Sequence, residues 1–188
     1  MNTRIRQAAA ALASLACFAL NSGAAQAASM VKLTDVHICC KGCATAIEKA
    51  VAKTPDVKPS INQKEGTVEL TAQDDAALQK AVNRIAAAGF HGGIAEDSKV
   101  QFKAVKVPEG NVQRLEIAHI HNCCAECTKA IKAAIAEVEG VAGDSLKAKS
   151  TKFVIEGDFS AEEAIKAIEK AGFHASLPKE KVEKKAPK

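Results

Sequence analysis

Apolar residues recur at helical spacing in four parts of the chain. Ala46, Ile47, Ala50 and Val51, for example, pair up at separations of three and four positions, which places them on one face of a helix. Such spacing predicts helices over 43–54, 74–88, 127–138 and 160–171. Shorter segments around them are predicted to be strands, at 31–38, 57–63 and 67–72 and again at 112–122, 143–149 and 151–156.

The order of these elements repeats because the sequence itself repeats. When Cys40 is aligned with Cys124, the segment CATAIEKAVAKTPDV (43–57) matches CTKAIKAAIAEVEGV (127–141) without a gap. After a one-residue deletion, VNRIAAAGFH (82–91) matches IKAIEKAGFH (165–174), and a last strand is expected from each Gly-Phe-His onward. The pattern predicts an α+β fold of two ferredoxin-like βαββαβ units in tandem.

The two units are expected at residues 30–97 and 112–178, with a linker at 98–111 between them. Within the linker, VQFKAVKV (100–107) has strand character and is either an added edge strand of the second unit or an extended connection. Ser160 and Glu163 have the spacing of a capping box at the start of the last helix.

Residues 1–28 have the features of a secretory signal peptide. Arg4 and Arg6 precede an apolar run, and Ala25-Gln26-Ala27 has the small-x-small pattern of a cleavage site, so cleavage is expected near Ala27 or Ala28. The run is shorter than the roughly 20 residues that a membrane-spanning helix needs. A periplasmic or secreted protein is therefore expected, with a buried N-terminal helix as the alternative.

Composition and charge exclude several functions. The net charge of +4 comes from Arg4, Arg6 and the lysines of 179–188, a tail expected to be disordered. This distribution of charge does not favour a nucleic-acid partner. The sequence has no Trp or Tyr, so stacking of bases on these aromatic residues is not favoured either. No activated serine, carboxylate pair or phosphate-binding glycine loop occurs in the sequence, and the protein is not expected to be an enzyme.

Cysteine and histidine are concentrated in two motifs, HICCKGC (37–43) and HNCCAEC (121–127). Two cysteines three positions apart can close on one soft ion. At a helix start the backbone amides also favour the thiolate, which is the form that binds metal. Such sites select Cu(I) and Zn(II), with Hg(II) and Cd(II) as alternatives. The first-choice ligands are Cys40 with Cys43 and Cys124 with Cys127.

The neighbouring residues are candidate additional ligands. Strand alternation directs Val36 and Ile38 to the helices and His37 to the open face of the sheet. Cys39 and Cys123 are candidate third thiolates, with a second ion on that face as the alternative for Cys39, and His37 and His121 are candidate fourth ligands. His119 falls in the same row as His121 and Cys123.

A βαββαβ unit with Cys-x-x-Cys after its first strand resembles the heavy-metal-associated domain, and the resemblance spans residues 31–177. That family includes copper chaperones, the N-terminal arms of metal-pumping ATPases and a periplasmic mercury-binding protein. The resemblance implies a protein that sequesters or transfers copper, zinc or a toxic soft metal. Its candidate partners are a metal-transporting membrane protein or another metal-binding protein.

The resemblance also places the remaining histidines. In the family fold the last strand lies beside the first, so His91 and His174 are expected on the open face near His37 and His121, with Phe90 and Phe173 packed inward. The family usually has Gly-Met-(Thr/His/Asp) before Cys-x-x-Cys. Here those places are taken by His37, Ile38 and Cys39 in one unit and by His121, Asn122 and Cys123 in the other, so the metal preference is expected to differ.

Two other functions fit the cysteines. Cys-x-x-Cys also suits a periplasmic thiol-disulfide redox protein, although no thioredoxin-like pattern surrounds it. Cysteines of exported proteins also form structural disulfides.

Overall fold

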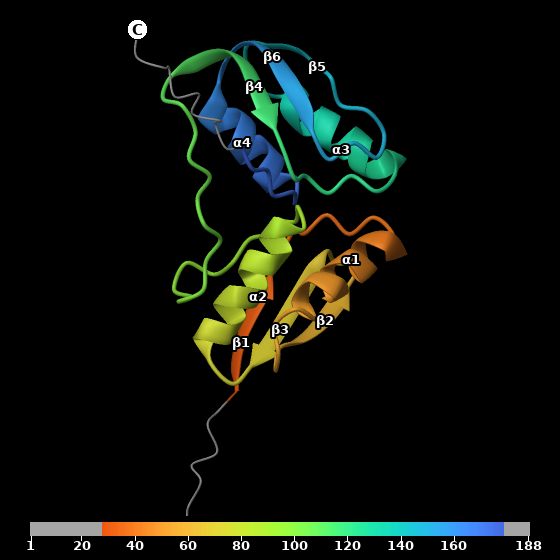
Figure 1. The fold of residues 1–188 in the computed structure, drawn as a ribbon, viewed down its shortest axis with the longest axis vertical. Coiled ribbons are helices and arrows are strands. Elements are labelled where there is room, and N and C mark those ends of the chain that lie inside the picture. The colour runs from red at the N-terminus through yellow and green to blue at the C-terminus, as the bar shows by residue number, and fades with distance from the viewer. Residues whose placement is uncertain (1–27, 179–188) are drawn as a thin grey trace, which may run out of the picture.

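A computed structural model describes residues 28–178, so the signal-peptide and tail predictions lie outside the described residues. Two units with the same order of elements are stacked one on the other, the first below the second in Figure 1. The first contains β1 (Ser29–Leu33), α1 (Lys41–Val51), β2 (Lys58–Asn62), β3 (Thr67–Ala72) and α2 (Asp75–Ala87). The second contains β4 (Asn111–Ile117), α3 (Ala125–Ala136), β5 (Val141–Asp144), β6 (Phe153–Ser160) and α4 (Ala161–Lys170).

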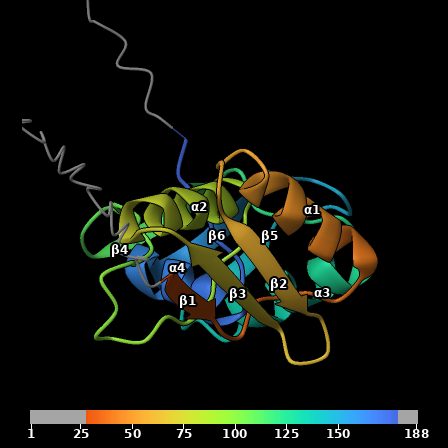
Figure 2. The same ribbon diagram turned by 90° about the horizontal axis from the view of Figure 1, so that it is seen from below.

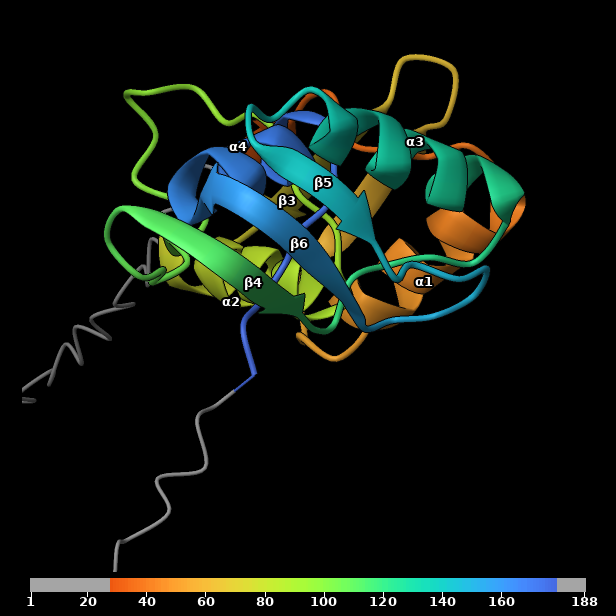
Figure 3. The same cartoon turned by 90° about the horizontal axis from the view of Figure 1, so that it is seen from above.

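Each unit has one antiparallel three-stranded sheet, in the order β1-β3-β2 or β4-β6-β5. Figure 2 views the first sheet from below and Figure 3 the second from above, so the sheets lie towards opposite ends of the molecule. The predicted helical stripes pack against the sheets, with Ile47 and Val51 of α1 and Ile131 and Ile135 of α3 buried. The α+β prediction is confirmed.

The first strand of each unit is shorter than predicted. β1 ends at Leu33 rather than at residue 38, and β4 ends at Ile117 rather than at 122. Asp35 and His119, at equivalent places, have φ values of 56° and 58°, and this left-handed conformation turns the chain out of the ladder. Val36 and Ile38 are nevertheless buried, as predicted.

The predicted last strand of each unit is reduced to one isolated bridge, Thr34 with Gly93 and Ala118 with Ser176. The Gly-Phe-His backbone pairs between the units instead. His91 N donates to Gly172 O at 3.1 Å, and His174 N donates to Gly89 O at 3.0 Å. Backbone groups used across the boundary are not free to extend a ladder within a unit.

The linker contains no strand, so 100–107 is an extended connection and not an edge strand. The Gln79 side chain of α2 fastens it, because its amide donates to Gln101 O at 2.8 Å and accepts from Gln101 N at 3.1 Å. Side chains also cap the second helix of each unit. Asp74 accepts from Ala77 N in α2, and Ser160 accepts from Glu163 N in α4, where the sequence predicted a cap.

Candidate metal centre

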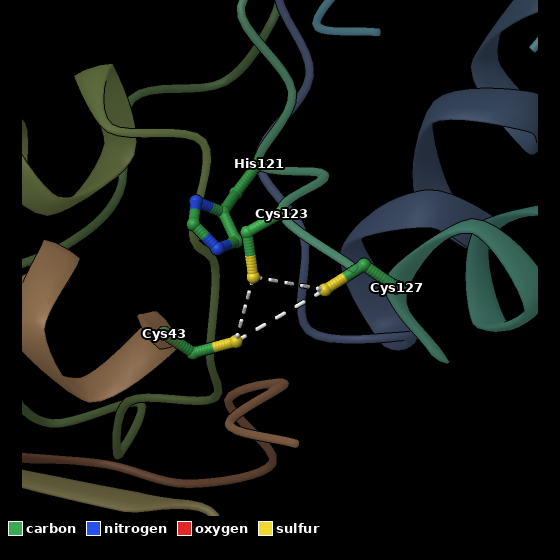
Figure 4. A group of neighbouring side chains, drawn as sticks. All are labelled: Cys43, His121, Cys123 and Cys127. Atoms are coloured by element: carbon green, nitrogen blue, oxygen red, sulfur yellow. Dashed lines mark hydrogen bonds between the residues drawn. The ribbon is translucent and has the colours of Figure 1, made fainter. Parts of the chain in front are cut away.

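The amino-terminal ends of α1 and α3 meet at the boundary between the units and bring six free cysteines together. Cys40 and Cys124 are the N-cap residues, and neither thiol makes a capping hydrogen bond. Cys43 and Cys127, one turn later, are 0% exposed. Figure 4 shows Cys43 of the first unit pointing towards Cys123 and Cys127 of the second.

The closest sulfur pair crosses the boundary, and other pairs across it are as short as those within a unit. Cys39 Sγ lies 3.4 Å from Cys124 Sγ and 3.6 Å from Cys127 Sγ. Cys123 Sγ lies 3.7 Å from the sulfurs of both Cys40 and Cys43. The sequence divides the six cysteines between two motifs, one in each unit, and the structure brings their thiols together in one place. We call it the thiol centre: Cys39, Cys40, Cys43, Cys123, Cys124 and Cys127.

The sulfurs form triangles of a size that suits a metal ion. Cys40, Cys43 and Cys123 are separated by 3.7 Å along each side. The middle of such a triangle is about 2.1 Å from each sulfur, close to the roughly 2.3 Å of a zinc–thiolate bond. The same distances are far longer than the roughly 2.05 Å of a disulfide. Three-coordinate binding of a soft ion needs only small movements here.

Crowding of the thiols separates their pKa values. The hydrogen bond between Cys43 and Cys127 raises the pKa of Cys43, with burial adding to it, and lowers the pKa of Cys127. Burial is the main cause of the raised pKa values of Cys39 and Cys123. The Cys43 amide at the helix start lowers the pKa of Cys40 to about 7.

His37 and His121 lie beside the thiols. A ring nitrogen of His37 groups with the sulfurs of Cys39 and Cys127, all within 4.8 Å of one another. A ring nitrogen of His121 groups in the same way with Cys43, Cys123 and Cys127. Among the described residues, Nε2 of each histidine is buried without a hydrogen-bond partner. The two candidate fourth ligands therefore complete sulfur sets drawn from both units.

Each of these histidines stacks on a phenylalanine of the opposite unit. The ring centroids of His37 and Phe173 are 4.5 Å apart, and those of His121 and Phe90 are 4.2 Å apart. Phe90 and Phe173 also form a backbone bridge. The phenylalanines thus pack inward as predicted, but at the boundary between the units.

Gly89 allows this close approach. A Cβ at Gly89 would overlap the backbone nitrogen of His121, and its φ of 87° also favours glycine. Gly172 stands in the same relation to His37 N, with a φ of 86°. These glycines lie just after α2 and α4, and they set the spacing between the units.

The other three predicted histidine ligands lie elsewhere. His119 is exposed and its Nδ1 lies 3.0 Å from Ser176 Oγ, because its left-handed backbone turns it away from the strand row. His91 and His174 do not join the cysteines, because their strands are replaced by pairing between the units. They lie with Glu169, which the sequence analysis did not select.

The thiol centre has a route to solvent on one side. An open groove of about 440 Å³ is lined by residues that include His119, His121, Cys123 and Lys149. It reaches one residue of the centre, Cys123 of the second unit, and the neighbouring His121. Within residues 28–178, no helix has both the length and the apolar character to cross a membrane.

A comparison with protein families identifies a known domain in the second of the two units. Residues 119–174 match the model of the heavy-metal-associated domain. This domain binds metal and is not catalytic, in agreement with the expectation that the protein is not an enzyme. No curated protein sequence matches the chain.

Two solved structures have a low overall similarity to the chain. The N-terminal soluble domains of Bacillus subtilis CopA are 18% identical with a TM-score of 0.31, over 81% of this chain and 95% of theirs. The water-soluble region of the P-type ATPase CopA from the same organism is 18% identical with a TM-score of 0.32, over 86% of this chain and 99% of its own.

Proposed function

We propose that the protein binds soft heavy-metal ions, Cu(I) foremost, in the one thiol centre that both units build. The observation that carries this proposal is the convergence of six free thiols from two helix starts, with sulfur separations of 3.4–4.0 Å. Thiolate ligands select Cu(I) and other thiophilic ions over hard cations. The match of residues 119–174 to a metal-binding domain supports the same function.

Charge balance favours several monovalent ions over one. Six thiolates cannot all be ionised in a partly buried cluster without counter-charge, because buried like charges repel. Each bound Cu(I) brings one positive charge and displaces thiol protons. We therefore expect a polynuclear Cu(I) centre in which sulfurs bridge neighbouring ions, and uptake that strengthens as the pH rises.

Zinc would use a smaller part of the centre. Cys43, Cys123, Cys127 and His121 form a set of three sulfurs and one imidazole within 4.8 Å. Three cysteines and one histidine form a closed tetrahedral zinc site. Part of the centre, with His121, thus offers Zn(II) a mononuclear site, whereas all six thiols offer Cu(I) a polynuclear site. The number of ions bound per chain distinguishes the two.

The biological role follows from three further parts of the proposal. The two units are taken as tandem ferredoxin-like copies of the heavy-metal-associated fold, because their elements follow the same order. The signal peptide of residues 1–28 would deliver the chain to the periplasm or outside the cell. There the protein sequesters ions or exchanges them with a metal-transporting membrane protein or another metal-binding protein, through the groove beside Cys123. Cell fractionation and detection of the cleaved N-terminus check the location.

The central experiment is an anaerobic Cu(I) titration of the reduced protein against a competing chelator. We expect more than two tightly bound ions per chain and short metal–metal distances in X-ray absorption spectra. Cys40→Ser with Cys43→Ser removes sulfurs from a shared cluster, so it should abolish most of the uptake rather than half. Lys41→Ala, an exposed change at the first residue of α1, is the matched control and should bind like the wild type.

Two results contradict the proposal. One tightly bound ion per unit, with one ion left in the double variant and no metal–metal scattering, would mean two independent sites. No tight binding by the reduced protein would favour the thiol-disulfide alternative, which its reduction potential and disulfide-exchange rate would then test.

A further inference from the structure

A second group of potential metal ligands lies at the boundary between the units. Two of its three residues are the histidines of the Gly-Phe-His sequences. The rings of His91 and His174 lie nearly parallel, with centroids 6.0 Å apart and an interplanar angle of 7°. Glu169 of α4 is beside them, with Oε1 3.9 Å from His91 Nε2. One atom from each of the three residues lies within 4.8 Å of the other two.

This group is separate from the thiol centre. In each Gly-Phe-His sequence the phenylalanine stacks on a histidine of the opposite cysteine motif. The next residue points elsewhere, as successive side chains of an extended backbone do. His91 instead contacts Phe102 of the linker with its ring tilted, the ring centroids being 4.2 Å apart. The linker thus covers the histidine pair.

The three side chains are largely buried but poorly satisfied. The side chains of His91 and Glu169 are only 18% and 22% exposed. Nδ1 of His174 is buried without a hydrogen-bond partner among the described residues. Burial lowers the pKa of His174 and, together with the neighbouring His174, that of His91, which favours the neutral form of imidazole that binds metal. A partly buried carboxylate beside an unpaired imidazole nitrogen is costly unless a further group pairs with them.

We propose that His91, Glu169 and His174 form a second metal site, which takes a borderline divalent ion such as Zn(II). Two imidazoles and one carboxylate are ligands that zinc favours, whereas Cu(I) prefers the sulfurs of the thiol centre. Three protein ligands leave a coordination position open, as in sites that exchange water or another ligand. The ion would bridge the units, because His91 belongs to the first and the other two ligands to the second.

The internal repeat supplies the test variant. Glu169 aligns with Ala86, so the first unit already has alanine at this place in its own helix. Glu169→Ala therefore copies a residue that the fold accommodates. Glu163→Ala, an exposed glutamate on the same helix, is the matched control. Glu169→Gln keeps the shape and removes only the charge.

The experiment is a zinc titration of the whole protein, followed through the imidazole ¹⁵N resonances of each histidine. We expect the rings of His91 and His174 to shift with zinc in the wild type and the Glu163 control. Zinc affinity read at these rings should fall at least about tenfold in Glu169→Ala and Glu169→Gln, as loss of a ligand or its charge demands. Cu(I) uptake by the thiol centre should be unchanged in all four proteins, which also reports correct folding.

The inference is overturned if neither ring responds to zinc in the wild type, or if the Glu169 variants bind like the control. Because each resonance belongs to one histidine, the result does not depend on whether the thiols bind metal. Failure of the Cu(I) titration would contradict the proposed function and leave this site standing.

Discussion

The two cysteine motifs present equivalent thiols to one centre, yet the chain behind them is anchored differently. In the first unit the residue after the histidine is Ile38, which is 5% exposed in the core. In the second it is Asn122, 4% exposed, whose Nδ2 donates to Lys147 O and Ser150 O at 3.0 and 3.1 Å. Its Oδ1 accepts from Thr128 Oγ1 at 2.7 Å. A polar residue can replace an apolar anchor when its hydrogen bonds are complete.

The boundary itself is nearly symmetric where the anchors are not. Each Gly-Phe-His offers a glycine for close approach, a phenylalanine for stacking and a histidine for the second site. Glu169, opposite Ala86 in the repeat, breaks that symmetry, as does the contact of His91 with Phe102. The comparison indicates that pairing of the units constrains the boundary residues, whereas each unit supports its own loop by whatever contacts it has.

The largest effect is expected from the boundary glycines. Gly89→Ala adds a strained left-handed alanine and a steric overlap with the His121 backbone, so it should cost roughly 3 kcal/mol or more of unfolding free energy. The units should also separate, and Cu(I) stoichiometry should fall. Urea unfolding and metal analysis measure both. Gly143→Ala, where a Cβ meets nothing within 4 Å, is the control and should change little.

Exchanging the anchors tests whether each loop depends on its own contacts. Ile38→Asn buries an amide among apolar groups, and we expect a loss of about 2–4 kcal/mol. Asn122→Leu leaves the carbonyls of Lys147 and Ser150 without their donor and should cost about 1–3 kcal/mol. Chemical denaturation of the metal-free protein measures both. A variant that unfolds at the wild-type urea concentration would show that its loop does not depend on the contact that was replaced.

Acid should weaken the metal-free protein through its buried histidines. Burial, with the neighbouring His174, lowers the pKa of His91 to about 4 from an unfolded value near 6.5. The unfolded chain therefore binds more protons between these values, and unfolding free energy should fall as the pH drops from about 6.5 to 4, by on the order of 2 kcal/mol. His91→Gln should flatten this part of the curve in urea unfolding at several pH values. An unchanged slope would mean that His91 titrates normally in the folded protein.

The smallest effect concerns the two motif histidines. His121 shares its ligand group with three sulfurs and His37 with two, so His121→Ala should weaken zinc binding by about tenfold, and His37→Ala by less. Cu(I) binding through the sulfurs should change little in either variant. Competitive titration with both metals makes the comparison. If zinc affinity stays at the wild-type level in both variants, neither imidazole is a ligand.

Local patterns in the sequence were sufficient for the elements and for the chemistry of each motif. Helical spacing located α1 and α3, and the Cys-x-x-Cys sequences correctly put thiols at their starts. Alternation predicted the burial of Val36 and Ile38, and spacing predicted the Ser160 cap. These features depend on neighbours within a few positions, which a sequence displays directly.

The sharing of one centre was decided only by the tertiary structure. An inward-facing Phe90 or Phe173 satisfies the same hydrophobic pattern whether it packs within its unit or against the other, so burial alone did not indicate a boundary between units. Glu169 lies in the sequence like any solvated helix charge, and its partners His91 and His174 come from different units. Hydrophobic packing is non-directional, and only the backbone pairing at Gly89 and Gly172 determines which surfaces meet and which ligands they bring together.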